Sequence, residues 1–347
     1  MTVLHRLSLL GAALALAGCA SVSPDGLRGD VAQLTAGRTA GVQAALPATR
    51  ARGRTGMAAA ALPPADPAAR AQAQQSMADW LAEPLTQDAA VRIALLNNPG
   101  LQARLAALGV ADAERVQAIT LPNPHFTLGR FANSHEREIE RTLAFSLLDL
   151  ITLPWRTERQ AERLQIATLQ AAQDVVTLAA DTRRAWLRAV AAEQVAATHE
   201  RMVEAAEAGT ELARRMASVG NWSRLQLARE QAVLHEAHRQ RARARLAAAT
   251  AREDLNRRLG VWGTQAQYQL AAQLPPLPAA ALPADGIETT ALRERLDVQA
   301  ARRQLDTQAV RVGWSRAGAV FGDIGLAYQS NTATERDGGH RDTTRGW

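Results

Sequence analysis

The chain has 347 residues, of which 21% are charged and only 4% aromatic, and its abundant apolar residues are mostly small. Such a composition argues against compact globules with bulky cores and favours long, closely packed helices. The sequence has no lysine, so all 40 Lys and Arg positions are arginine, which explains a sequence pI near 10.8 at a formal net charge of only +6. The charges are interspersed along predicted helices, so the sequence does not indicate nucleic-acid binding.

The N-terminus has the pattern of a bacterial export signal. An apolar run from Leu7 to Ala17 is too short to span a bilayer as a stable helix. It ends at Cys19, the only cysteine, in a Leu-Ala-Gly-Cys sequence that resembles a lipobox. We therefore expect a signal peptide over 1–18 and a lipid on Cys19. Ala20, in place of aspartate, resembles the signal of lipoproteins sorted to the outer membrane.

Residues 19–84 are rich in Ala, Gly, Pro and Arg and have no sustained apolar period, which predicts a linker or a segment laid over a surface. Apolar residues recur at helical spacing from Leu85 onward, and Thr86 is a candidate helix cap. The pair Asn98-Pro99 interrupts the pattern, so we expect a short helix, a break, and a longer helix to about Ile119.

The sequence predicts a β-hairpin over residues 123–150. Period-two alternation places the apolar side chains of the second strand on one face, with Arg141 as an exception, and polar or small ones on the other. The first strand repeats this more weakly, with Phe126 and Leu128 opposite His125, Thr127 and Gly129. Pro122, Pro124 and Pro154 are expected to mark the junctions between strand and helix.

Two long helices are predicted next, over 155–218 and 222–260. The first has a heptad-like seam of mostly small residues: Leu164, Thr168, Ala171, Val175, Leu178, Thr182, Ala185, Ala189, Ala192 and Ala196. The seam of the second includes Val233, Ala237, Ala244, Ala251 and Leu255, and Gly260 has the position of a helix stop. The turn between them reads Val219, Gly220, Asn221, Trp222, Ser223, so the two helices form an antiparallel hairpin. Together, residues 85–262 make a first structural unit.

A Pro-rich connection over 263–286 leads to a partial repeat of this unit over 287–347. Residues 94–103 align with 291–300, and about thirty residues later 126–128 are answered by another amphipathic strand with Ile324, Leu326 and Tyr328 on one face. We expect this second unit to be incomplete, ending inside a polar tip without a return strand.

Strands with one apolar and one polar face suit a barrel in lipid, whose exterior is apolar and whose lumen is wet. The alternative is a soluble β-sheet packed on helices. The fold class we predict is mainly α with amphipathic β-strands, combining a long antiparallel coiled-coil helix hairpin with strands of a transmembrane β-barrel. The lipid-facing residues would be Phe126, Leu128, Leu143, Phe145, Leu147, Ile324, Leu326 and Tyr328.

The order of these elements resembles the TolC-type outer-membrane efflux channel family. The elements are a lipobox, a helix ending in Pro-Asn-Pro before a strand hairpin, two long helices meeting at a glycine turn, and a repeat. The resemblance implies a homotrimer with a twelve-stranded barrel in the outer membrane of a Gram-negative bacterium, and helices in the periplasm. It implies a passive exit duct that works with a periplasmic adaptor protein and an inner-membrane pump. Val219 to Ser223 match the hairpin tip that meets the adaptor, and Cys19 matches the acylated cysteine.

The sequence does not indicate an enzyme, a cofactor or a resident metal. His235 and His238 have the wrong spacing for a zinc motif and are expected on a solvated helix face; His125 and His135 with Glu136 could bind a metal ion transiently at a channel mouth. Two alternatives stay open: a periplasmic adaptor-like lipoprotein and a nonfunctional, truncated channel fragment. The exported substrate, whether metal ion, organic toxin or polypeptide, also stays open.

Overall fold

The structure, a computed structural model, describes residues 21–39, 62–63, 66–120, 123–277, 285–318, 325–335 and 340–347. Only the backbone is described for Phe145, 147–151, 309–318 and 325. The predicted signal peptide, Cys19 and Ile324 lie outside these residues. The chain divides into a first compact unit (Met1–Ser23, Leu108–Thr168 and Asp297–Trp347) and a second (Pro24–Ala107 and Leu169–Leu296).

Two helices lie in the segment predicted to be a linker: α2 (Arg28–Thr35) and α4 (Pro67–Ala82). The sequence analysis expected a linker or a segment laid over a surface here and did not predict these two helices. Asp66 caps α4 by accepting a hydrogen bond from Ala69 N at 3.1 Å, and Pro67 occupies the first helical position. Both are start signals that act without an apolar period.

The short helix, break and longer helix predicted after Leu85 are confirmed as α5 (Gln87–Asn97) and α6 (Pro99–Ile119). Thr86 caps α5 by accepting from Ala89 N at 3.2 Å, and Asn98 caps α6 by accepting from Leu101 N at 3.0 Å. The same order recurs in the aligned part of the chain, as α9 (Ile287–Glu294) and α10 (Leu296–Gly318).

The long helix α7 (Leu147–Ser218) has 72 residues, about 108 Å along its path, and begins before the predicted 155. The expectation that Pro154 marks the junction was wrong, because Pro154 lies inside the helix. Proline lacks a backbone N–H and therefore removes one helical hydrogen bond. The helix α7 continues through Pro154 without this bond. Strand β2 ends at Ser146, so Leu147 belongs to the helix and not to the strand.

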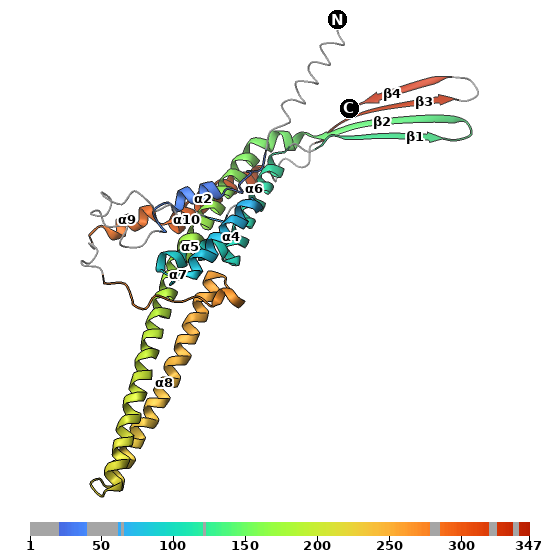
Figure 1. Cartoon of the computed structure of the whole chain (residues 1–347). Coiled ribbons are helices and arrows are strands. Elements are labelled where there is room, and N and C mark those ends of the chain that lie inside the picture. Colours follow the sequence, from blue (N-terminus) through green and yellow to red (C-terminus); the bar gives the residue numbers. More distant parts are fainter. Residues whose placement is uncertain are drawn as a thin grey trace. The chain divides into compact units, whose positions relative to one another are not determined.

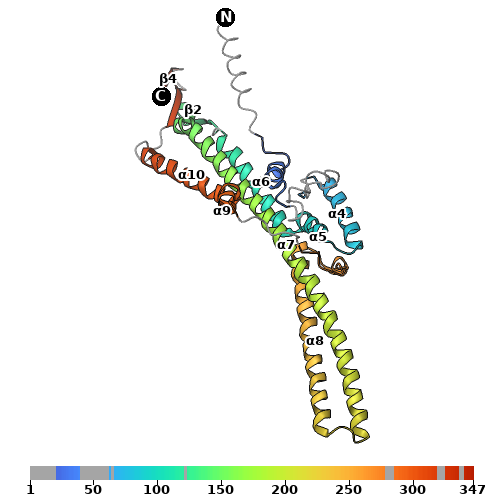
Figure 2. The same ribbon diagram turned by 90° about the vertical axis from the view of Figure 1, so that its left-hand side faces the viewer.

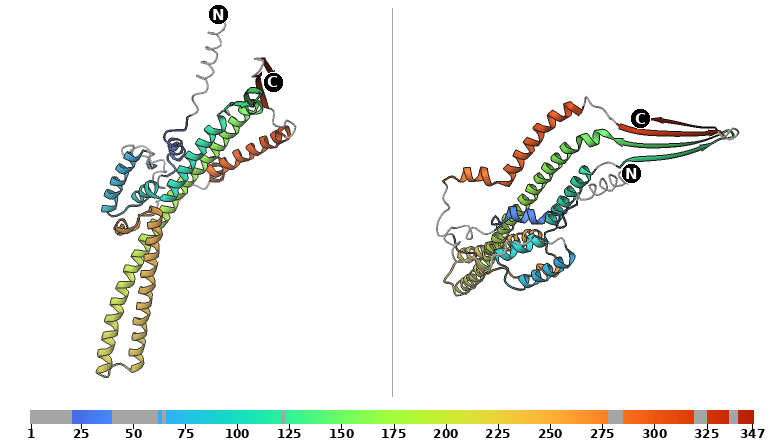
Figure 3. Two further views of the ribbon diagram at one scale, coloured as in Figure 1. Left: turned by 90° about the vertical axis from the view of Figure 1, so that its right-hand side faces the viewer. Right: turned by 90° about the horizontal axis from the view of Figure 1, so that it is seen from above.

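Helix α8 (Arg224–Leu259) runs back beside the C-terminal part of α7 in all views of the molecule (Figures 1, 2 and 3). On α7 the predicted seam holds, since none of its members is exposed and Thr168, Ala171, Val175, Thr182, Ala185 and Ala189 are buried. On α8, Ala244 and Leu255 are buried, but Val233 is 55% exposed. Its neighbour Leu234 lies on the less exposed side, so the seam runs one residue out of the predicted phase there.

Acidic residues on α7 meet basic residues on α8 along the length of this hairpin. Asp181 pairs with Arg258 at 3.0 Å, Glu193 with Arg252, Glu200 with Arg241 and Arg245, and Glu207 with His238. Glu193, Glu200 and Glu207 are spaced by seven residues, which is the heptad repeat of a coiled coil. Their partners Arg252, Arg245 and His238 are also spaced by seven residues, so a shift of one heptad would bring new pairs of opposite charge together. Exposed pairs stabilise little individually, so these pairs favour the antiparallel arrangement without fixing one register.

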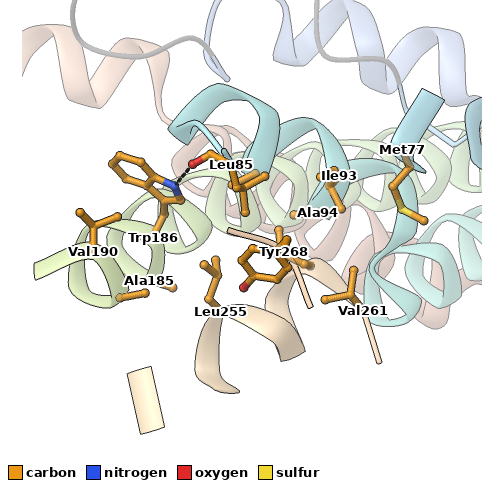
Figure 4. Packing of buried hydrophobic residues seen from close by; sticks show 13 residues of the cluster. Met77, Leu85, Ile93, Ala94, Ala185, Trp186, Val190, Leu255, Val261 and Tyr268 are labelled. Atoms are coloured by element: carbon orange, nitrogen blue, oxygen red, sulfur yellow. Dashed lines mark hydrogen bonds between the residues drawn. The ribbon is translucent and has the colours of Figure 1, made fainter. Parts of the chain in front are cut away.

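The main core of the second unit lies where α5 packs against α7 and the C-terminal end of α8 (Figure 4). The indole of Trp186 on α7 donates to Leu85 O at 2.8 Å, and Leu85 N donates to Gln269 O at 2.8 Å. Tyr268 follows the short 3-10 helix η2 (Gly263–Ala266) and donates its hydroxyl to Asn256 Oδ1 at 2.9 Å. These hydrogen bonds tie the segment after α8 to the helices.

Burial raises the pKa of the Tyr268 hydroxyl to about 12. Since this pKa is higher in the folded than in the unfolded chain, the stabilisation is complete below pH 10 and is lost as the pH rises toward 12. Tyr268 and Tyr328 are the two tyrosines of the chain. In a Tyr328→Phe variant, tyrosine absorbance should therefore report Tyr268 alone, with a midpoint near 12. A midpoint near 10 at a pH where the helices persist would contradict this packing.

Four antiparallel strands form one sheet in the order β1 (His125–Ala132), β2 (Glu136–Ser146), β3 (Gly325–Glu335) and β4 (Arg341–Gly346). Both strand hairpins turn at the same end of the sheet (Figure 3). The expectation of a missing return strand was wrong, because β4 pairs with β3 from Thr334–Arg341 to Gln329–Gly346. The strand β4 carries no apolar alternation, so only its pairing with β3 defines it.

None of the described helices combines the length and the apolar character needed to span a membrane.

Candidate functional site

The turn between α7 and α8 is a compact, hydrogen-bonded tip. Gly220 has a φ of +81°, which the sharp reversal requires, and its N–H donates to Ala217 O at 3.1 Å. The N–H groups of Asn221 and Trp222 both donate to Met216 O, at 2.9 and 3.2 Å. These bonds satisfy carbonyls at the end of α7 that have no partner within the helix, so the backbone of the tip is well defined.

Ser223 begins α8 with a capping box. Its hydroxyl accepts from Gln226 N at 3.2 Å, and its own N–H donates to Gln226 Oε1 at 2.8 Å. Val219 is 68% exposed and Leu225 is 62% exposed, so the tip presents apolar side chains to its surroundings on a rigid backbone. An exposed apolar group on a fixed turn is a suitable contact for another protein.

Charged side chains surround this tip. Hydrogen bonds from Arg215 and Arg214 to the Glu211 carboxylate lower the pKa of that group below its ordinary value. Arg224 begins α8 and is exposed. The tip therefore presents apolar side chains, with charged residues on the adjoining turns of both helices.

Gly220→Ala and Gly209→Ala should change the local stability of the hairpin in opposite directions. At Gly220 the positive φ makes alanine unfavourable by about 1–2 kcal/mol, although nothing lies within 4 Å of the added methyl group. At Gly209, inside α7, alanine should stabilise the helix by about 1 kcal/mol. Hydrogen exchange of the Asn221 and Trp222 amides should become faster in the first variant, and exchange near residue 209 should become slower in the second. Equal effects of the same sign would contradict the described turn.

The sheet carries the residues predicted to face lipid. The register places Phe126, Leu143 and Tyr328 directly across from one another on β1, β2 and β3. Phe126 and Leu128 are 65% and 63% exposed, and Leu143 and Leu326 are also exposed. Of the other predicted members, Leu147 lies in α7, and the side chain of Phe145 and residue Ile324 lie outside the described part. Contact with lipid stays a prediction.

Trp347 is an additional member of this face that the sequence analysis missed. The pairing of Gln329 with Gly346 places Trp347 opposite Tyr328, and the two rings lie with centroids 4.7 Å apart. The signal in the sequence was the aromatic residue itself, but its position on the face depends on β4. Phe126, Leu143 and Tyr328 on three strands and Trp347, which directly follows β4, thus form one apolar row.

The opposite face of the sheet is polar. Gln329 donates to Glu140 Oε1 at 2.7 Å, and Asn331 donates to Glu138. His125 lies on this face, while His135 lies in the β1–β2 turn, where its N–H donates to Asn133 Oδ1 at 2.9 Å. The described residues include no group of three or more His, Cys, Asp or Glu side chains placed to hold a metal ion. On α8, Glu236, between His235 and His238, pairs with Arg239 and Gln240.

The sequence matches none of the protein-family models and none of the curated proteins with which it was compared. The structure resembles several solved outer-membrane channels. CusC has a TM-score of 0.60 at 17% identity, over 77% of this chain and 66% of that one. The CmeC channel of Campylobacter jejuni has a TM-score of 0.60 at 17% identity, over 75% of this chain and 60% of that one. The MtrE channel of Neisseria gonorrhoeae has a TM-score of 0.56 at 18% identity, over 74% of this chain and 61% of that one.

The chain thus spans about two thirds of the length of CusC and somewhat less of the other two. Identities of this size establish the fold alone. With its mainly helical architecture, its long helix hairpin and its strand sheet, the chain has the fold of the TolC-type outer-membrane channels.

Proposed function

We propose that this chain is the subunit of an outer-membrane exit duct, through which a substrate passes without chemical change. The observation that carries this proposal is a four-stranded sheet with an apolar row on one face and the acidic residues of the strands on the other, in a fold shared with outer-membrane channels. The row of exposed Phe126, Leu143 and Trp347 with half-buried Tyr328 suits contact with lipid chains. The face with Glu138 and Glu140 suits a watery lumen.

The edges of the sheet support assembly of several copies, and the resemblance to TolC-type channels suggests three. Strands β1 and β4 are its two edges, and unpaired backbone groups cost several kcal/mol each in lipid. A barrel closes only if further strands cover both edges, and three copies of this sheet would supply twelve strands. Acylation of Cys19 would add a lipid anchor to each copy.

The tip at Val219–Ser223 is the proposed contact for a periplasmic adaptor, which would couple the duct to an inner-membrane pump. Its rigid turn and its exposed apolar residues support this role. The helix α7 connects β2 to this tip without interruption. A pump would supply the energy and the substrate choice, so the duct itself needs no catalytic group, and we propose that the chain is not an enzyme.

An adaptor-like lipoprotein is the second candidate, because adaptors also carry long helix hairpins. The order of elements disfavours it. In the described part of the chain, helices α5 and α6 precede the strands, and η2, α9 and α10 follow the hairpin. An adaptor hairpin would instead be expected between compact β-domains.

Reconstitution of the purified full-length chain into planar lipid bilayers tests the duct. Discrete ion-conducting steps are expected, and replacing Glu138 and Glu140 with Gln should lower the preference for cations. The matched control is Glu204→Gln with Glu230→Gln on the helix hairpin, which should change stability little and leave sheet-dependent selectivity unchanged. Absence of conductance from inserted protein would favour the adaptor or the nonfunctional fragment.

A further inference from the structure

The sheet separates its charges by face. The register places five arginines on the side that carries Phe126 and Leu143: Arg130, Arg137, Arg141, Arg341 and Arg345. The acidic residues of the strands all lie on the other side: Glu136, Glu138, Glu140, Glu335 and Asp342. This follows from strand alternation, since Glu and Arg take turns along the start of β2. We call the first side the arginine face.

The arginine face is graded along the strands. Leu326, Tyr328, Trp347, Phe126 and Leu143 occupy the end away from the hairpin turns, and the arginines occupy the three rows nearest the turns. Arg137 and Leu143 are six residues apart on β2, which corresponds to about 20 Å along the strand. A surface that is apolar at one end and cationic at the other matches a lipid molecule, which has acyl chains and a charged head group.

The five guanidinium groups are not neutralised by the sheet itself. None of them forms an ion pair with a carboxylate in the part of the chain that the structure describes, and Arg141 has only a long hydrogen bond of 3.5 Å to Thr332 Oγ1. The strand carboxylates point away from them on the opposite face. Arg130, Arg137, Arg341 and Arg345 are exposed. Like charges gathered on one face repel, so an anion that bridges them would be bound favourably.

Helices α6 and α7 join β1 and β2 at the end of the sheet away from the turns, so in the proposed duct the turns and their arginine rows lie toward the outer leaflet. We propose that the arginine face binds phosphate groups of lipid in this leaflet. A guanidinium group binds a phosphate through two parallel hydrogen bonds, and its charge is always present. The hydroxyls of Ser330 and Thr343 lie among the arginine rows on the same face and can donate further hydrogen bonds. Basic residues beside an apolar surface are the usual basis for recognition of anionic lipids.

This inference rests on the proposed function, because the face meets lipid only if the sheet is inserted. It goes further by naming the chemical class of the lipid and the residues that bind it. A second copy of this chain is a poorer occupant, because the same face on that copy is also cationic. Free phosphate is the other source of the same anion, and only a lipid would also use the apolar rows.

Binding of lipid A that carries two phosphates to the purified full chain, in an uncharged detergent, tests the proposal. The test variant replaces all five arginines of the face with Gln. The affinity of this variant for lipid A should fall about tenfold or more. A variant with Lys at the same five positions should have an affinity between those of the original chain and the Gln variant, because lysine keeps the charge but not the paired hydrogen bonds. Lipid A with one phosphate should bind the original chain more weakly than lipid A with two. Inorganic phosphate at the same concentration should not displace the lipid A that carries two phosphates.

A matched control removes five exposed arginines from the helix hairpin: Arg188, Arg201, Arg224, Arg229 and Arg243. Its affinity should stay within about twofold. Equal affinity of the face variant and the original chain, or an equal loss in the control, would overturn the proposal. Displacement by inorganic phosphate would assign the face to the free ion. If the original chain fails to insert into membranes, the proposed function fails too. If the original chain inserts but the variant without the five arginines binds lipid A equally well, only this inference fails.

Discussion

Replacing Gly260 with alanine should lower the free energy of unfolding by about 2–5 kcal/mol. Gly260 ends α8 with a φ of +71°, and a Cβ there would lie 2.7 Å from Asn97 O and 3.0 Å from Pro99 Cδ. The backbone of the α5–α6 break cannot move aside easily, because the Asn97 side chain donates to Leu259 O at 3.1 Å and Gly260 O at 2.8 Å. The variant should therefore suffer both backbone strain and a steric clash.

Gly263→Ala is the matched control for this prediction. Gly263 also has a positive φ, +59°, but nothing lies within 4 Å of the added methyl group. It should lose only the strain, about 1–2 kcal/mol. Urea unfolding followed by the helical circular-dichroism signal measures both variants. Equal losses would mean that Gly260 does not lie against the α5–α6 break.

Trp186→Ala should lower the free energy of unfolding by about 3–5 kcal/mol. Trp186 is only 3% exposed, and its ring fills the space beside Val190 and Leu85 in the core (Figure 4). The change removes this ring and also leaves Leu85 O without its indole donor. Trp186→Phe keeps most of the ring and should lose about 1–3 kcal/mol, chiefly from the buried carbonyl.

Trp262→Ala serves as the control for the same measurement, because Trp262 is 81% exposed. Its effect should stay within about 0.5 kcal/mol. Since the chain has seven tryptophans, the fluorescence lost in each variant is compared with the original chain, and the emission lost with Trp186 should lie at shorter wavelength than that lost with Trp262. A Trp186→Ala variant as stable as the control would contradict the packing of α5 against α7.

Local signals in the sequence predicted much of the fold. Thr86, Asn98 and Gly260 act at helix ends through their own hydrogen bonds or conformation, so their roles can be seen without tertiary structure. The seam of α7 was predictable because it repeats over many heptads. A pattern of this length averages out single exceptions, whereas α8 has fewer apolar residues, and there Val233 was placed wrongly.

Long-range pairing accounts for what the sequence did not predict. Strand β4 reads Arg-Asp-Thr-Thr-Arg-Gly and has no apolar alternation, although Asp337-Gly338 before it is a hairpin signal. The five arginines of the arginine face come together only through the pairing of β1, β2, β3 and β4. In the sequence of β2 alone, Arg141 therefore looked like an exception on an apolar face. Helix α4 lacks an apolar period, and only Met77 among its residues is buried.

The mass of the protein extracted from outer membranes with mild detergent tests the central claim most directly. We expect a complex of three copies, each beginning at an acylated Cys19. Its sheets would cover one another's edge strands. A single copy that fractionates away from the outer membrane would contradict the claim, because the open edges of β1 and β4 would then have no partner in lipid.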